Sequence, residues 1–343
     1  MSTAALCDRH NLEMPVGKRI TQLDGLRAIA VLMIFGSHAY GIPLLWSGVD
    51  LFFILSGFLI TGILLEQREQ RSMTSYLASF YLKRTRRIIP AYIVFLAFSS
   101  IFIGIAWINH WYLFLFLMNC DLFRKFDTHN TFGILWSLAV EEQFYLFWPI
   151  AVYLLSETAL AWLAGSLILI APLLRWIATV FFPLTWPIHT STPFRMDLLA
   201  VGALIALAWR HRRTEVRRFG PYGLLIFGAA AIPLLLFSRH FWFQPSANTV
   251  LVNVWLYELI LIGWAGVLLW VLSDRNVEML RIRPLVYVGS ISYSFYLVHR
   301  LLISLVQPHI HHYSVAIAFG ASLLYATISW FVVEERILRR GIS

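Results

Sequence analysis

The sequence predicts an all-α integral membrane protein with about ten transmembrane helices. Of its 343 residues, 59% are hydrophobic and only 13% are charged, whereas an ordinary soluble domain carries roughly 25% charged residues. Hydrophobic runs of about 20 residues, the length that spans a bilayer as a helix, recur from end to end with short polar breaks. One helical membrane domain is therefore expected to fill nearly all of the chain.

Ten apolar segments are long enough to cross the bilayer. An eleventh, residues 111–118, is too short for a hydrocarbon core of about 30 Å at about 1.5 Å per residue, so we expect it to be re-entrant or interfacial. Residues 1–22 and 336–343 are expected to be cytoplasmic tails before and after a membrane domain at 23–335. The ten segments lie at residues 23–42, 48–65, 89–107, 135–155, 159–180, 193–209, 221–237, 251–272, 285–306 and 314–333.

The basic residues set the predicted topology. Of the 27 Lys and Arg residues, 20 fall on one side of a ten-span arrangement, 3 on the other and 4 within spans. Since Lys and Arg gather in cytoplasmic loops, both termini are expected to be cytoplasmic. The net charge of +9 is then explained by topology and by attraction to anionic lipid head groups, and it requires no nucleic acid partner. Cys7 and Cys120 fall on opposite sides of the membrane, so no disulfide is predicted.

Ionisable side chains inside the spans are the candidates for function. Each costs at least about 2.5 kcal/mol to insert, so each needs a partner, a water-filled cavity or a role. Arg27 and His38 lie eleven residues apart in the first span, which places them on one helix face and about 16 Å apart along its axis. Arg27 is expected at the cytoplasmic end and His38 in the outer half of the bilayer. The alternative is a snorkelling Arg and a buried His whose hydrogen bonds are satisfied.

Asp50 begins the second span, a short loop after His38. A carboxylate beside an imidazole would orient and activate it as a base, although Asp50 could equally cap its helix. Other spans bring ionisable groups to the same outer depth, which predicts a shared polar cavity that opens outward. These groups are Arg175, Arg195, Asp197, His299 and Arg300.

Two adjacent acids enter the membrane in the fourth predicted span. Glu141 and Glu142 point about 100° apart on a helix, so one of them faces the core, and the sequence does not determine which. A spacing of four residues puts Ser137, Glu141 and Tyr145 on one face.

A basic segment precedes the third predicted span. In it Arg84, Arg86 and Arg87 are followed by Pro90, a residue suited to the first turn of a helix. Such a cluster is explained either by topology alone or by binding of the phosphates of an anionic donor beside Arg27.

Several familiar catalytic motifs are absent from the sequence. It contains no Gly-rich phosphate loop, no G-x-S-x-G elbow and no H-E-x-x-H motif, which disfavours nucleotide hydrolysis and serine or zinc proteolysis. His309, His311 and His312 have a spacing that could bind a metal, but neither an acid nor a cysteine stands beside them. No metal site is predicted.

Six motifs follow one another along the ten-span plan. They are LDGLRAIAVLMIFGSHAY, GVDLFFILSGFLI, YLKRTRRIIPAY, WSLAVEEQFYLFWP, PFRMDLLAVGALIA and SISYSFYLVH. In this order, over about residues 20–335, they resemble the bacterial acyltransferase-3 family of membrane O-acyltransferases. The resemblance implies that Arg27 and His38 form the activity-linked motif. It also implies that the family's other motif residues correspond to Asp50, Arg84, Arg87, Pro90 and either Glu141 or Glu142.

The resemblance implies a donor and a location. The chain is expected to act in the bacterial inner membrane on an acyl-CoA, here acetyl-CoA, and to hold no bound cofactor. The donor phosphates would dock from the cytoplasm. The residues expected to bind them are Arg27, Arg84, Arg86 and Arg87.

The same resemblance implies how the acceptor is activated. His38 would act as a base, or through a transient acyl-imidazole, on a hydroxyl of an exopolysaccharide, a lipopolysaccharide or another lipid-linked glycan. Asp50, Glu141 or Glu142 would tune the pKa of His38. The acceptor or its cavity would contact Tyr145, Arg195, Asp197, Tyr293 and His299.

Two features depart from the family's pattern. Many members carry an additional soluble domain after the helices, and this sequence is expected to have none. Any partner acyl carrier or second transferase would then be a separate protein, as would any polysaccharide assembly proteins. The family's last His is often followed by Pro or an aromatic residue. Here Arg300 follows His299, which weakens the case for a specific role of that pair.

Two other classes of protein compete with an acyltransferase. A proton-coupled transporter of a sugar-containing or anionic substrate would also bury Arg, His and Glu at one depth, but it should show inverted repeats or matching broken helices, and neither is visible. A structural subunit of a polysaccharide assembly complex would leave the spacing of Arg27 and His38 unexplained.

Overall fold

The protein is helical throughout its described part. A computed structural model describes residues 20–69, 71–120, 132–182, 185–238, 247–309 and 312–339. These residues form helices and turns with no strand among them, which confirms the predicted all-α class. Cys7, His311 and most of the two predicted tails lie outside the described residues. The α-helices are α1 (Thr21–Tyr40), α2 (Gly48–Arg68), α3 (Met73–Ile103), α5 (Leu135–Leu154), α6 (Glu157–Phe181), α7 (Trp186–Thr190), α8 (Met196–His211), α9 (Arg213–Phe219), α10 (Gly223–Phe237), α11 (Tyr257–Ser273), α12 (Arg283–Ser290), α13 (Ser292–Val306), α14 (Ser314–Ser329) and α15 (Glu335–Arg339).

Six helices in the described part are long and apolar enough to cross a membrane. They are Leu45–Arg68, Met73–Ile103, Glu157–Phe181, Arg213–Phe237, Leu251–Ser273 and Ser314–Leu338. The other four predicted spans correspond to α1, α5, α8 and α13. Of these, α8 has 16 residues and α13 has 15, while α1 and α5 carry ionisable residues such as Arg27 and Glu141. All four of these helices carry candidate site residues, as do α2 with Asp50 and α3 with Arg84 and Arg87 among the six longer ones.

Helix α3 differs from its prediction. It runs without a break over 31 residues from Met73 to Ile103, so the basic segment is its first half rather than a loop before it. Pro90 therefore lies inside the helix and not in its first turn, which corrects the sequence-based assignment. Residues 111–118 form no continuous helix: a 3₁₀ turn at Trp111–Leu113 is followed by further turns.

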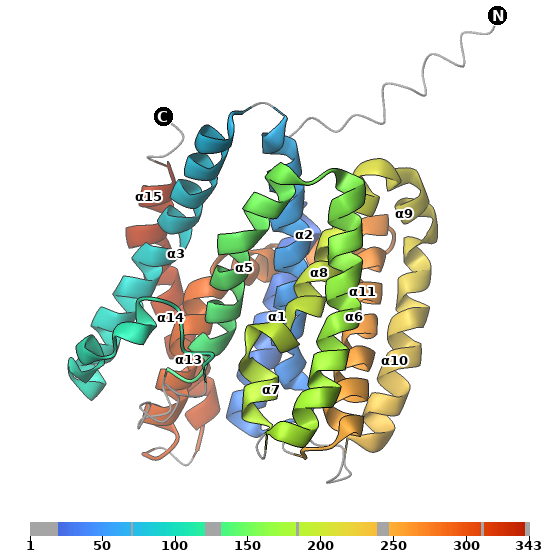
Figure 1. Ribbon diagram of the computed structural model, residues 1–343. Helices are drawn as coiled ribbons and strands as arrows, with labels where there is room; N and C mark the ends of the chain where they lie inside the picture. The colour runs from blue at the N-terminus through green and yellow to red at the C-terminus, as the bar shows by residue number, and fades with distance from the viewer. Residues whose placement is uncertain are drawn as a thin grey trace, which may run out of the picture.

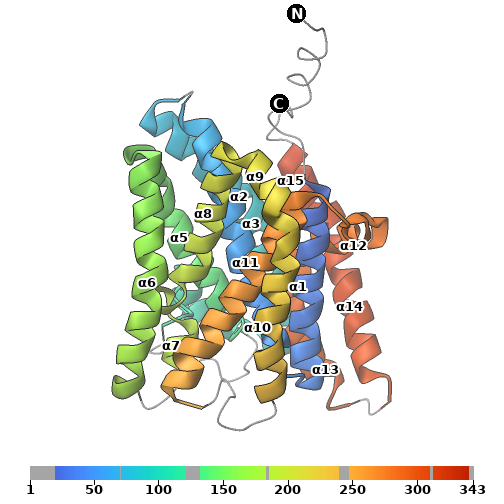
Figure 2. The same ribbon diagram turned by 90° about the vertical axis from the view of Figure 1, so that its right-hand side faces the viewer.

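The long helices run side by side in one bundle (Figure 1). The short helix α7 lies at one end of it, and the short helices α9 and α15 lie at the other, in both Figure 1 and Figure 2. Helix α2 is the central element, since it packs against α1, α5, α8 and α11. Of its side chains, those of Leu51, Phe53 and Ile54 are at most 1% exposed.

Two glycines allow α2 and α8 to touch backbone to backbone. A Cβ atom on Gly57 would lie 2.0 Å from the carbonyl oxygen of Leu199, and one on Gly202 would lie 2.1 Å from that of Ile54. Small residues let membrane helices approach in this way, and the close packing replaces the hydrophobic driving force that lipid cannot supply. Any side chain at either position would push α2 and α8 apart.

We predict that Gly57→Ala lowers the thermal unfolding midpoint of the purified protein, because its methyl group overlaps the α8 backbone. Gly62→Ala on the same helix is the matched control, since a Cβ atom there meets nothing within 4 Å. Thermal unfolding in lipid nanodiscs, followed by circular dichroism, measures both variants. Equal midpoints for the two variants would contradict the close crossing.

Candidate functional site

A cavity lined by three guanidinium groups lies among α1, α2, α3, α5 and α13. Its volume is about 470 Å³, and we call it the cationic cavity. Among the described residues, two carboxylates share it with the guanidiniums, so the described lining carries a net positive formal charge. Its polar lining residues are Asp24, Arg27, Ser56, Arg84, Arg87, Ser137, Glu141, Tyr145, Ser290, Ser292, Tyr293 and Tyr296.

Only one of the two adjacent acids, Glu141, faces the cationic cavity. Glu141 lines the cavity and accepts a 2.5 Å hydrogen bond from the hydroxyl of Ser56. Glu142 does not line it, and its Oε1 atom is buried with no hydrogen-bond partner among the described residues. On the cavity wall, the guanidinium of Arg84 stacks 5.2 Å above the ring of Tyr145. These contacts hold Glu141 and Arg84 in place, whereas Glu142 belongs to the packing behind them.

Three of the four predicted donor-binding residues line the cationic cavity. Arg27, Arg84 and Arg87 do so, and Arg86 does not. In a continuous helix, residues three apart share a face, whereas Arg86 lies about 100° away from Arg87 and further still from Arg84. The structure therefore separates Arg86 from the other three, and the cavity lining gives no support to its predicted role in donor binding.

A second cavity of about 460 Å³ surrounds the last turn of α1. We call it the aromatic cavity, because the indoles of Trp46, Trp136 and Trp186 line it together with His38, His189 and Arg300. The ring of His189 lies 5.4, 4.9 and 6.2 Å from those of Trp46, Trp136 and Trp186. Burial lowers the pKa of His189, which lies in the short helix α7, to about 4, so that imidazole is neutral near pH 7. Its Nδ1 atom is 2.7 Å from the hydroxyl of Tyr257.

No pattern in the sequence singled out His189 or the three tryptophans. These residues lie close to the ends of predicted spans, where Trp is common in any membrane protein. Only the folded chain shows that they surround a single cavity with His38.

His38 is hydrogen-bonded to a second histidine rather than to an acid. Its Nδ1 atom lies 2.8 Å from Nε2 of His299, and Nδ1 of His299 lies 2.6 Å from the backbone carbonyl of Tyr296. A carbonyl oxygen can only accept, so Nδ1 of His299 carries a proton and donates a hydrogen bond to Tyr296. In a neutral His299 ring, Nε2 is then the acceptor, and it receives the hydrogen bond that Nδ1 of His38 donates. When both rings are neutral, Nε2 of His38 therefore carries a lone pair that can accept a proton. His299 is fully buried and lines neither cavity.

The predicted contact between Asp50 and His38 is wrong. Asp50 is fully buried and forms an ion pair with Arg195 at the start of α8. The imidazole of His38 instead faces His299 on α13. A short connecting loop brings the two helix ends near each other, but the side chains point to different neighbours.

The remaining outer charges form buried ion pairs rather than a cavity. Arg175 on α6 pairs with Asp197 on α8 at 2.7 Å and with Glu258 on α11. The guanidinium of Arg195 lies 4.6 Å from the ring centre of Tyr257. Arg195 and Asp197 line neither cavity, so the cavities give no support to the prediction that these residues contact the acceptor. Their charges cross-link helices, because a charge buried in this bundle requires a partner.

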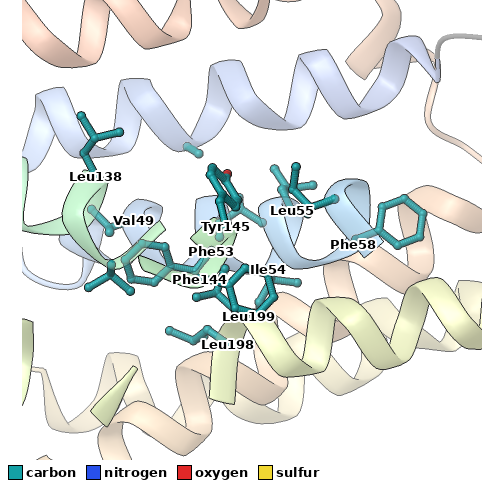
Figure 3. Close-up of a cluster of buried hydrophobic side chains, with 14 of the residues drawn as sticks. Val49, Phe53, Ile54, Leu55, Phe58, Leu138, Phe144, Tyr145, Leu198 and Leu199 are labelled. Carbon is teal, nitrogen blue, oxygen red and sulfur yellow. The ribbon is translucent and has the colours of Figure 1, made fainter. Parts of the chain in front are cut away.

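Val49 and Tyr296 line both cavities and form the partition between them. The hydroxyl of Tyr296 is 2.6 Å from that of Ser137 and donates a 2.8 Å hydrogen bond to the carbonyl of Ile134. Figure 3 shows Val49 and Leu138 in the apolar cluster beside this partition, with Tyr145 further along α5. One hydrogen-bonded phenol and one valine thus stand between the guanidiniums and the His38 imidazole.

The comparison with known families identifies the chain. The family model described as an acyltransferase domain matches residues 20–334. The chain belongs to the acyltransferase-3 family. The resemblance inferred from the six motifs over residues 20–335 is therefore confirmed.

Two relatives of this acyltransferase-3 chain are named for an enzymatic activity. It is 29% identical over 370 residues to the peptidoglycan O-acetyltransferase OatA of Listeria monocytogenes and 27% identical over 355 residues to the O-acetyltransferase OatA of Staphylococcus aureus. Each match covers 94% of this chain and 56% or 57% of the relative, so the chain spans just over half the length of these proteins. No solved structure matches the chain.

We predict that Asp50→Asn lowers the thermal unfolding midpoint by several degrees. The substitution leaves the buried Arg195 without its counter-charge, and breaking a buried pair in this way costs about 3–5 kcal/mol. Replacing both partners by apolar residues, Asp50→Leu with Arg195→Met, should recover most of the loss, because no charge is then left unpaired. A double variant no more stable than Asp50→Asn would contradict a structural role for the pair.

Proposed function

We propose that this chain is a membrane O-acyltransferase that moves an acyl group, chiefly acetyl, from acyl-CoA to a hydroxyl of a glycan. One observation carries the proposal: a cavity lined by three guanidiniums and a cavity that contains His38 meet at a partition of two side chains, Val49 and Tyr296. Acyl transfer between two large substrates requires such a meeting point. The O-acetyltransferase names of the relatives and the family membership support the same reaction.

The cationic cavity suits the donor. Guanidinium groups bind phosphate oxygens through paired, charge-assisted hydrogen bonds, and Arg27, Arg84 and Arg87 present three of them to one space. The charges of Asp24 and Glu141 offset only part of this positive field. A CoA phosphate in this cavity would leave the thioester free to extend toward Tyr296.

We place the donor on the cytoplasmic side through the distribution of charge. In the described part of the chain, α9 and α15 carry Arg213, Arg217, Arg218, Arg336 and Arg339 at one end of the bundle. Basic residues mark the cytoplasmic ends of membrane helices. The proposed topology has ten spans, including α1, α5, α8 and α13 beside the six longer helices, in the bacterial inner membrane with both termini cytoplasmic.

His38 supplies the chemistry. Its Nε2 atom takes the proton of the acceptor hydroxyl while the hydroxyl oxygen forms a bond to the thioester carbon. The carbon–sulfur bond then breaks, and the CoA sulfur leaves as a thiol with the proton that His38 returns. His299 holds His38 in the tautomer that exposes Nε2, since the two hydrogen bonds of its own ring fix the proton positions. His299 is therefore a positioning residue.

Acetyl transfer in isolated membranes tests the proposal. Membranes that contain the wild-type chain should move radiolabelled acetyl groups from acetyl-CoA to glycan, and His38→Ala at matched expression should lose nearly all transfer. His299→Phe removes the acceptor for the Nδ1 proton of His38 and should lower kcat with little change in the KM for acetyl-CoA.

A folded His38→Ala protein with wild-type transfer would overturn this mechanism. Absence of transfer with wild-type protein as well, in membranes that contain both substrates, would favour the transporter alternative instead.

We predict that Arg87→Gln raises the KM for acetyl-CoA about tenfold or more, because a lost charge-assisted hydrogen bond to phosphate costs about 1.5–3 kcal/mol. Arg86→Gln is the matched control: it removes a charge from the same helix but from a side chain outside the cavity, and its KM should stay within about twofold of the wild-type value. Steady-state kinetics on purified protein measure both, and equal KM values would contradict donor binding in the cationic cavity.

A further inference from the structure

Attack of a hydroxyl on a thioester creates a negative charge beside His38. As the new carbon–oxygen bond forms, an electron pair of the carbonyl double bond moves onto the carbonyl oxygen. Enzymes that transfer acyl groups aim hydrogen-bond donors at that oxygen. His38 accepts the proton of the attacking hydroxyl, so it is not such a donor. The reaction therefore requires another donor at the place where the thioester meets His38.

Tyr296 has the position that this donor requires. Of the described residues, Val49 and Tyr296 are the two that line both cavities, and of these only Tyr296 has a polar side chain. The ring centre of Tyr296 lies 5.5 Å from that of His299, the residue whose ring is hydrogen-bonded to His38. His38 lines the aromatic cavity together with Tyr296. A thioester that reaches His38 from the cationic cavity must therefore pass the phenol of Tyr296.

The guanidiniums of the cationic cavity are not placed for this role. Arg27 precedes His38 by eleven residues on α1, which separates their backbones by about 16 Å along the helix axis. Arg84 and Arg87 line the cationic cavity and not the aromatic one. These charges suit the phosphate end of the donor, whereas the phenol lies where the acyl end would be.

The hydroxyl of Tyr296 can turn to a new acceptor without leaving a buried carbonyl unpaired. It donates a 2.8 Å hydrogen bond to the carbonyl of Ile134. The hydroxyl of Ser137 donates to the same carbonyl at 3.2 Å and lies 2.6 Å from the hydroxyl of Tyr296. Two hydroxyl protons thus share one carbonyl acceptor. When the proton of Tyr296 turns to a substrate oxygen, Ser137 keeps the Ile134 carbonyl paired, and the cost of an unsatisfied acceptor is avoided.

We propose that the phenol of Tyr296 donates a hydrogen bond to the carbonyl oxygen of the donor thioester and stabilises the oxyanion that forms there. This inference rests on the proposed function, because it assigns a role in that reaction. Tyr296 keeps its proton throughout. The proton of the acceptor hydroxyl goes to His38 and then to the CoA sulfur, and the electron pair of the oxyanion restores the carbonyl double bond as the carbon–sulfur bond breaks. Tyr296 is a catalytic residue, and Ser137 is a positioning residue that frees the phenol.

Steady-state kinetics test the role of Tyr296 in the transition state. Tyr296→Phe removes the donor and keeps the ring, so kcat should fall about 10²–10³-fold while the KM for acetyl-CoA changes less than about threefold. Ser137→Ala should lower kcat by a smaller factor. Tyr287→Phe is the matched control, since its hydroxyl donates to Thr327 and the residue lines neither cavity. Its kcat should equal that of the wild type.

Infrared spectroscopy of the bound donor tests the hydrogen bond itself, without turnover. Acetyl-CoA with a ¹³C-labelled carbonyl is bound to His38→Ala protein in nanodiscs, in which the acetyl group stays on the donor. A hydrogen bond to the carbonyl oxygen lowers the stretching wavenumber of the carbonyl. The labelled band should therefore lie lower in this protein than in one that also carries Tyr296→Phe. Replacement of Tyr296 by 3-fluorotyrosine, a stronger donor of nearly the same size, should move the band lower still.

A folded Tyr296→Phe protein with the kcat of the wild type would overturn the proposal. Equal carbonyl wavenumbers in all three of these proteins would also overturn it, and the 3-fluorotyrosine protein keeps the test decisive if Tyr296→Phe does not fold. A carbonyl band that depends on Tyr296, in a chain whose wild type transfers no acetyl group to glycan, would contradict the proposed function and leave the assigned hydrogen bond standing.

Discussion

The contact between α2 and α8 is the constraint on which the rest of the structure depends. Gly57 and Gly202 bring the two backbones together, and the ion pair of Asp50 with Arg195 joins the same helices. Helix α2 supplies part of the lining of the cationic cavity, and Val49 belongs to both cavities. A shift of α2 would therefore change the cavities and their partition together, although neither glycine touches a substrate.

The bundle uses buried charge in two distinct ways. Arg175 and Arg195 are fully buried and paired with acids, and they cross-link α2, α6, α8 and α11. Arg27, Arg84 and Arg87 instead line a cavity in which guanidiniums outnumber carboxylates. In the first group, the acidic partner offsets the free-energy cost of burying a charge among apolar helices. In the second group, the excess of guanidiniums creates a positive electrostatic potential that attracts an anionic molecule.

Local patterns in the sequence predicted the helices and the face shared by Arg27 and His38, because helix geometry depends on neighbours a few positions apart. They could not predict the partner of His38, since His299 lies 261 positions further along the chain. The same limit applies to Asp50, whose partner Arg195 is 145 positions away. The two adjacent acids show most clearly what the sequence could predict. Helix geometry predicted that one of Glu141 and Glu142 faces inward, but only the packing against Ser56 shows that it is Glu141.

We propose that the donor enters the cationic cavity from one face of the membrane, that the acceptor enters the aromatic cavity from the opposite face, and that the two substrates meet beside His38. Sealed membrane vesicles of the two orientations, prepared from cells that make the chain and its glycan, test it directly. Radiolabelled acetyl-CoA supplied only outside inverted vesicles reaches the face that carries α9 and α15, and we expect label in glycan there and none in right-side-out vesicles. Equal labelling in sealed vesicles of both orientations would contradict the account.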